Sequence, residues 1–166
     1  MSKIYIDPKV LLQRLHSLLD AGDARSALEL IERHGTSTVE LKNAHGVCLL
    51  RLGQIERAVG LFRNLVVLEG TTTLEQGLPT AYKTNFATSL LLAQNVSGCI
   101  AVLDEILDDE DPGVIRLRNA VKNWKKKLTP FRRFLFNLYG NTKSQPVILD
   151  FAPGDLTDPT HVRPAA

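Results

Sequence analysis

The sequence predicts an all-α protein built from antiparallel helix pairs, and three observations lead to this fold class. Apolar residues recur at three- and four-residue intervals through most of the first 140 residues, which is the periodicity of helices with one buried face. Helix-starting and helix-ending signals divide this stretch at short intervals. The resulting helices fall into pairs whose small and large apolar residues can be aligned, which indicates an internal repeat.

The composition fixes the kind of core that the chain can form. Hydrophobic residues make up 44% of the sequence but aromatic residues only 6%, so we expect one compact domain with a core of Leu, Ile, Val and Ala side chains. The predicted helices, in chain order, cover residues 8–19, 24–34, 41–50, 55–66, 79–92, 96–107, 112–127 and 130–139. Glu69 to Gly77, which holds two glycines and three threonines, is expected to be an exposed connection.

Each predicted helix has a recognisable signal at one of its ends. A polar N-cap residue followed by Pro at the first helical position opens three helices, at Asp7-Pro8, Asp111-Pro112 and Thr129-Pro130. Residues 36–38 offer an N-cap for the third helix, and Pro79 restarts the fifth. Gly22, Gly53 and Gln94-Asn95 mark the turns within the pairs, and Gly35 ends the second helix. Helical periodicity is lost after Asn141, where repeated prolines predict an extended tail.

The internal repeat becomes visible when the second helix pair is aligned with the third. Small residues then fall on small ones and large apolar residues on large ones: Gly46 on Ala87, Leu49 on Leu90, Ile55 on Val96, Ala58 on Cys99, Phe62 on Leu103 and Leu65 on Ile106. The first pair matches less fully, through Leu18, Gly22, Ala27 and Ile31. Small residues are expected at these positions because two helices approach closely only where no large side chain intervenes.

The second pair resembles the tetratricopeptide repeat, whose pattern it carries between Asn43 and Phe62. A small residue early in the first helix, a large residue three positions later, Gly at the turn, and an Ala and an aromatic residue in the second helix are all present. The chain departs from the family in having no Trp at the start of any unit, Leu15 at the small position of the first unit, and Gln94 in place of the turn Gly. The resemblance covers residues 8–108, and an unrelated bundle of helical hairpins is the alternative.

The resemblance implies a right-handed stack of about three helix pairs. Residues 1–140 would form the repeat domain, with capping helices at about 112–140, and residues 141–166 would form the extended tail. It also implies a concave face that binds an extended peptide or a helix of another protein. The family's positions on this concave face correspond in this sequence to Leu12, His16, Leu19, Asn43, Val47, Leu50, Arg51, Thr84, Thr88, Leu91 and Leu92. Leu12 and Val47 stand where a carboxylate-binding member would have polar groups, so a mixed apolar groove is expected. Each leucine can equally be interhelix core.

A second candidate surface is electrostatic. An acidic cluster at residues 104–111 is followed by a stretch without acids, from Pro112 to Leu149. Its basic candidates are Lys122, Lys125, Lys126, Lys127, Arg132 and Arg133. The predicted helix at residues 112–127 can be a cap with a solvated basic face, as terminal repeats need. Alternatively, the region 114–133 can bind anionic partners such as nucleic acid or a membrane surface. Phe131, Phe134, Leu135, Leu138 and Tyr139 follow helical spacing and are expected to pack in the core.

The tail segment from Gln145 to Phe151 is unusually apolar for an extended terminus. We expect it to cover a surface of the same chain, either the concave groove or the capping helices. The alternative is a linear motif that binds another protein.

The sequence contains no motif that would indicate catalysis, a metal or a cofactor. His-Glu-x-x-His, a phosphate-binding Gly-rich loop and Gly-x-Ser-x-Gly are absent, and the four histidines lack metal-like spacing. Cys48 and Cys99 are expected to be free thiols in a reducing cytoplasm. A net charge of +2 supports no general claim about nucleic acid or membranes, and nucleic acid is expected to be an unlikely partner. No apolar run is long enough for a membrane span, and residues 1–10 do not resemble a secretory signal. We therefore expect a non-catalytic scaffold that binds another protein.

Overall fold

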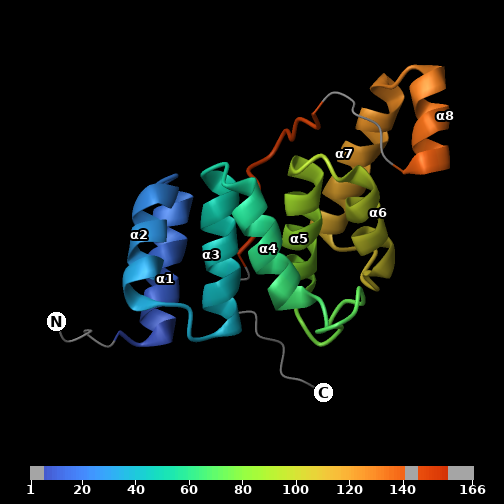
Figure 1. Cartoon of the computed structure of the whole chain (residues 1–166). Coiled ribbons are helices and arrows are strands. Elements are labelled where there is room, and N and C mark those ends of the chain that lie inside the picture. Colours follow the sequence, from blue (N-terminus) through green and yellow to red (C-terminus); the bar gives the residue numbers. More distant parts are fainter. Residues whose placement is uncertain (1–5, 141–145, 157–166) are drawn as a thin grey trace.

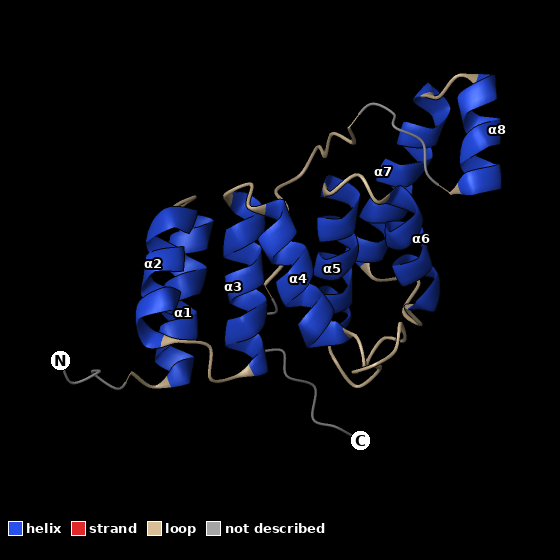
Figure 2. Ribbon diagram, in the orientation of Figure 1, coloured by secondary structure: helices blue, strands red, loops and turns tan. Residues whose placement is uncertain are grey.

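The computed structural model describes residues 6–140 and 146–156, and the regular elements of this part of the chain are α-helices (Figures 1 and 2). Consecutive helices pack against each other in a row that leads from α1 and α2 to α7 and α8 (Figure 1). The helices are α1 (Pro8–Asp20), α2 (Ala24–His34), α3 (Val39–Arg51), α4 (Ile55–Val66), α5 (Thr80–Leu92), α6 (Val96–Glu105), α7 (Pro112–Lys127) and α8 (Pro130–Tyr139). The all-α prediction is therefore confirmed.

The odd-numbered helices form a continuous layer. α1 contacts α3, α3 contacts α5, and α5 contacts α7, while each of these helices also packs against its even-numbered neighbours. α5 lies in the middle of this arrangement, against α3, α4, α6 and α7, so all residues from Tyr82 to Leu90 are buried. Any polar side chain on α5 must therefore find its hydrogen-bond partner inside the protein.

The turns inside the first three helix pairs share one backbone geometry. The residue at each turn has a positive φ, which is +78° at Gly22, +71° at Gly53 and +62° at Gln94. Its N–H donates to a carbonyl three residues earlier, and the next N–H donates to one five residues earlier, as in a Schellman-type helix end. Gln94 adopts the left-handed conformation at a cost of roughly 1–2 kcal/mol. The third pair thus makes the same turn without glycine.

The aligned small residues lie where the two helices of a pair meet. Ala27, Ala58 and Cys99 are fully buried at equivalent positions. In the second pair the Phe62 ring lies directly over Gly46, because an ideal Cβ on Gly46 would be 2.7 Å from both ring Cε atoms and closer still to Cζ. The ring itself is fully buried, so it has no free space into which it can move.

The connection between α4 and α5 is exposed at residues 69–73 and 75–77, as expected, but Leu74 is buried. Val67 and Leu74 form an isolated antiparallel bridge, and Leu74 is only 1% exposed. The Leu74 N–H donates to the Glu105 carboxylate at 2.6 Å. Residues 71–73 are exposed, but Leu74 anchors the loop to the end of α6, because its apolar side chain fills the core.

Two expectations for the C-terminal half are wrong. α6 ends at Glu105, so Leu107 lies outside the helix and is 85% exposed. Phe131, Phe134, Leu138 and Tyr139 are also exposed, whereas the buried residue of α8 is Phe136, whose ring meets Trp124 edge-on at 5.2 Å. α8 packs on α7 through the Phe136 side, and no other described helix covers its opposite face (Figure 1).

We predict that Gly46→Ala lowers the free energy of unfolding by about 1–3 kcal/mol, because the added methyl group must displace the buried Phe62 ring. Gly60→Ala is the matched control, since an ideal Cβ on this exposed glycine of α4 meets no atom within 4 Å. The control should be neutral or stabilising by up to roughly 1 kcal/mol, as expected for Gly→Ala in a helix. Chemical denaturation of both variants tests this, and equal stability of the two would contradict the proposed close contact.

Candidate functional site: an extended segment on the odd-numbered helices

Residues 146–156 form an extended segment that crosses the layer of odd-numbered helices from α7 to α3, as the red trace of Figure 1 shows. We call these residues the docked segment. Val147 is buried near Trp124 and Leu128, and Leu149, Phe151 and Leu156 pack partly buried against the core, whereas Ile148 is 82% exposed. The sequence predicts two alternative surfaces for the tail, the concave groove and the capping helices. The docked segment contacts both the capping helix and the odd-numbered helices. Gln145 lies outside the described residues.

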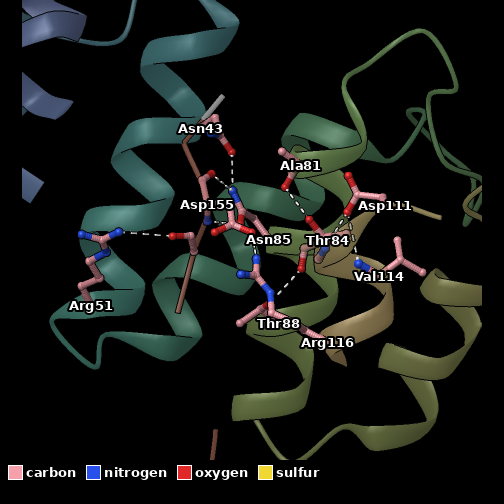
Figure 3. A network of polar contacts seen from close by, with 12 residues as sticks. Asn43, Arg51, Ala81, Thr84, Asn85, Thr88, Asp111, Val114, Arg116 and Asp155 are labelled. Carbon is pink, nitrogen blue, oxygen red and sulfur yellow. Dashed lines mark hydrogen bonds and ion pairs between the residues drawn. The ribbon is translucent and has the colours of Figure 1, made fainter. Parts of the chain in front are cut away.

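The amide of Asn85 on α5 holds the backbone of the docked segment (Figure 3). Its Oδ1 accepts from the Asp155 N–H at 2.8 Å, and its Nδ2 donates to the Asp155 carbonyl at 2.8 Å. One side chain thus pairs with both backbone groups of one residue. Because these groups are common to every residue except proline, the contact recognises an extended backbone whatever side chain it carries.

Asn43 on α3 completes this arrangement. Its Oδ1 accepts a second hydrogen bond from Asn85 Nδ2 at 2.9 Å, and both asparagines are at most 2% exposed. This bond joins two neighbouring helices of the odd-numbered layer and uses both N–H groups of the Asn85 amide. The orientation of Asn85 towards Asp155 is therefore fixed from inside the protein.

Arg51, at the end of α3, connects the docked segment to the first helix pair. Its Nη1 donates to the Leu19 carbonyl at the end of α1 at 2.6 Å, and its Nη2 donates to the Gly154 carbonyl at 3.4 Å. The planar guanidinium group presents several donors in a fixed geometry, which lets one side chain contact two separate backbone segments. The second contact is the longer and weaker one.

Gly154 allows the segment to lie close to α3. It has a φ of +87°, and an ideal Cβ at this position would lie 2.9 Å and 3.1 Å from the two methyl carbons of Val47, which is fully buried. Any side chain here would collide with Val47, and its backbone would also be strained, because a positive φ disfavours residues other than glycine.

Arg116 on α7 contacts the docked segment at two side chains. Its Nη2 lies 2.5 Å from the Asp155 carboxylate, and its guanidinium lies 5.3 Å from the centre of the Phe151 ring, within the range of a cation–π contact. Arg116 and Asp155 are each nearly half exposed. Solvent screens such a pair, so it contributes at most about 1 kcal/mol.

The groove positions inferred from the sequence fall into two groups. Asn43, Val47, Arg51, Thr84 and Thr88 lie beside the docked segment, three of them on α3 and two on α5. Leu12, Leu19, Leu50 and Leu91 are buried members of the core, and His16 and Leu92 are partly buried. The second and third helix pairs therefore supply the predicted positions that meet the segment.

Asn85, Arg116, Gly154 and Asp155 were missed by sequence reasoning. In the repeat alignment, Asn85 of the third unit falls on Ala44 of the second unit. A polar residue aligned with a buried alanine is the signal that could have identified it. Arg116 resembles the other basic residues of its helix, and Asp155 resembles an ordinary loop residue. No local pattern in the sequence distinguishes these two.

The basic candidates lie on α7 and α8, away from Asn85. Lys122, Lys126, Lys127, Arg132 and Arg133 are exposed, and the partly buried Lys125 lies over the Phe136 ring at 5.2 Å. Part of the neighbouring acidic cluster is structural, since Asp111 accepts from two N–H groups at the start of α7 and Asp109 pairs with Arg118 at 2.8 Å.

Burial changes the pKa of several titratable groups inside the described chain. Cys48 and Cys99 are free, and burial raises the pKa of each thiol to about 12, so both remain protonated near neutral pH. Burial also lowers the pKa of His45. Within residues 6–140 and 146–156, no group of three His, Cys, Asp or Glu side chains is placed to hold a metal ion.

Comparison of the chain with protein-family models, curated proteins and solved structures finds no match. Within the described residues, none of the helices has the length and apolar character needed to span a membrane.

We predict that Asn85→Ala releases the end of the docked segment, because the Asp155 backbone loses both of its partners. Leaving Asn43 without its hydrogen bond should also cost about 1–3 kcal/mol of stability. Amide exchange at Asp155, followed by NMR, should become faster in this variant. Asn64→Ala, at an exposed position on α4, is the control and should change neither quantity. Unchanged exchange at Asp155 would show that Asn85 does not hold the segment.

Proposed function

We propose that the chain is a non-catalytic protein-interaction scaffold that binds an extended peptide across α3, α5 and α7. The observation that carries this proposal is the Asn85 amide, which pairs with both backbone groups of Asp155. Asn43 orients this amide, and Arg51 adds a second contact to a backbone carbonyl. Side chains that bind backbone groups suit the recognition of an extended peptide, with neighbouring pockets and charges selecting among sequences.

The architecture is proposed to be that of the tetratricopeptide repeat, with three helix pairs stacked in a right-handed sense. The shared turn at Gly22, Gly53 and Gln94 and the contacts between successive odd-numbered helices support it. α7 and α8 would then act as the cap, since Val114, Leu117, Val121 and Trp124 bury one side of α7 against the preceding helices. In such a stack the odd-numbered helices line the surface on which the docked segment lies.

The proposed function predicts that a peptide with the sequence of residues 146–156 binds this surface when added separately. The chain's own segment competes at an effective concentration that can reach the millimolar range, so the test uses the full chain with Phe151→Ala, Gly154→Leu and Asp155→Ala, which weakens this segment at the glycine position as well as at Arg116. NMR titration with the natural peptide should shift the Asn85 side-chain amide resonances and neighbouring resonances of α3 and α7.

A scrambled peptide of the same composition is the control and should cause no such shifts. The full chain with Ile148→Ala, a substitution at an exposed position of the docked segment, should bind the natural peptide much more weakly, because its own segment stays in place. Absence of binding to the chain with Phe151→Ala, Gly154→Leu and Asp155→Ala, or shifts confined to the even-numbered helices, would refute the proposal.

A second candidate function is binding to anionic membrane surfaces through α8. Phe131, Phe134 and Leu138 recur at helical spacing on a face that is 59–70% exposed. Arg132 and Arg133 flank these side chains, and exposed lysines of α7 lie on the preceding helix. An amphipathic helix with aromatic residues on one face and basic residues beside it is typical of helices that lie in a membrane interface. The apolar component favours a lipid surface over nucleic acid.

We predict that the full chain sediments with vesicles containing phosphatidylserine but not with phosphatidylcholine vesicles. Phe134→Ser together with Leu138→Ser should weaken this binding at least about tenfold, because two apolar side chains no longer enter the interface. Leu107→Ser removes a large apolar side chain that is 85% exposed elsewhere and should have no effect. Equal sedimentation of all three proteins would exclude α8 as the membrane-binding element.

A further inference from the structure

We infer that the surface around Asn85 selects partner segments in which an aromatic residue is followed, three positions later, by glycine and then by an acidic residue. This inference rests on the proposed peptide-binding function and specifies the class of ligand. The docked segment carries this pattern as Phe151, Gly154 and Asp155. Gly154 meets Val47, whereas Phe151 and Asp155 both meet Arg116.

The glycine position is the most restrictive of the three. Val47 is fully buried on α3 and cannot move aside, so its methyl groups block any Cβ at this position. The left-handed φ of +87° adds a backbone penalty to the steric one. A ligand with a larger residue there must lift away from α3, and it then loses the contact between its carbonyl group and Arg51.

The acidic and aromatic positions are both selected by Arg116. The guanidinium pairs with the Asp155 carboxylate and at the same time faces the Phe151 ring (Figure 3 shows the carboxylate side). An amide in place of the carboxylate would keep a hydrogen bond but lose the charge attraction. Because this pair is nearly half exposed, its selectivity is smaller than that of the glycine position.

The contacts made by Asn85 and Arg51 reach backbone groups only and do not distinguish one sequence from another. They supply affinity for an extended segment, whereas Val47 and Arg116 supply selectivity. Because the chain's own segment already satisfies all of these contacts, a partner must displace it. A partner peptide therefore replaces the docked segment only if it matches the surface closely or is present at high concentration.

The test measures the affinity of four labelled peptides of residues 146–156 for the full chain with Phe151→Ala, Gly154→Leu and Asp155→Ala, by fluorescence anisotropy. The natural peptide should bind most tightly. The Gly154→Leu peptide should bind at least about tenfold more weakly, because overpacking and backbone strain both oppose it. The Asp155→Asn and Phe151→Ala peptides should each bind about two- to fivefold more weakly.

Adding Arg116→Gln to this protein should remove the preference for the natural peptide over the Asp155→Asn peptide while leaving the Gly154→Leu peptide weak. In the otherwise natural chain, Gly154→Leu should speed amide exchange at Asp155, which Ile148→Ala should not do. If no peptide binds, the proposed function itself fails. If the natural peptide binds but the Gly154→Leu peptide binds equally well, the selectivity inference is overturned and the peptide-binding function stands.

Discussion

The hydrogen bond between the buried amides of Asn43 and Asn85 joins the architecture of the protein to its candidate site. It lies between α3 and α5, in the layer of odd-numbered helices, and leaves the remaining polar atoms of Asn85 aimed at the docked segment. A buried amide without partners is costly. While the docked segment is in place, the Asn85 amide finds its partners on the neighbouring helix and on an extended backbone, so the segment and the helix layer share one hydrogen-bond network.

The docked segment has two roles, and the same contacts serve both of them. It completes the hydrogen bonding of the most buried helix, and it covers the surface that the proposed function needs. A partner peptide can take over both roles only by offering a backbone in the same extended form. When a segment leaves, water takes the place of its backbone groups at the Asn85 amide, so this contact favours ligands that offer a free extended backbone.

Several elements of the fold could be predicted because their causes are local. Gly22 and Gly53 marked the turns through their conformational freedom, and Asp111 marked the start of α7 through its capping side chain. The repeat alignment predicted that Gly46 must be small, and the structure gives the reason, because the Phe62 ring lies directly over it. Prediction failed for Phe131 and Phe134, because helical periodicity shows that a helix has an apolar face but not whether another element covers it.

The sequence by itself determined that the chain is helical, where its helices begin and end, and which small residues lie between paired helices, since spacing along the chain controls all of these. Only the tertiary structure decided that Asn85, Arg116 and Asp155 meet. They are separated by up to 70 positions, and their hydrogen bonds depend on how α5 and α7 pack side by side. Asn85 could be a surface residue on an isolated helix. It holds the docked segment because neighbouring helices bury it and an extended backbone lies opposite its amide.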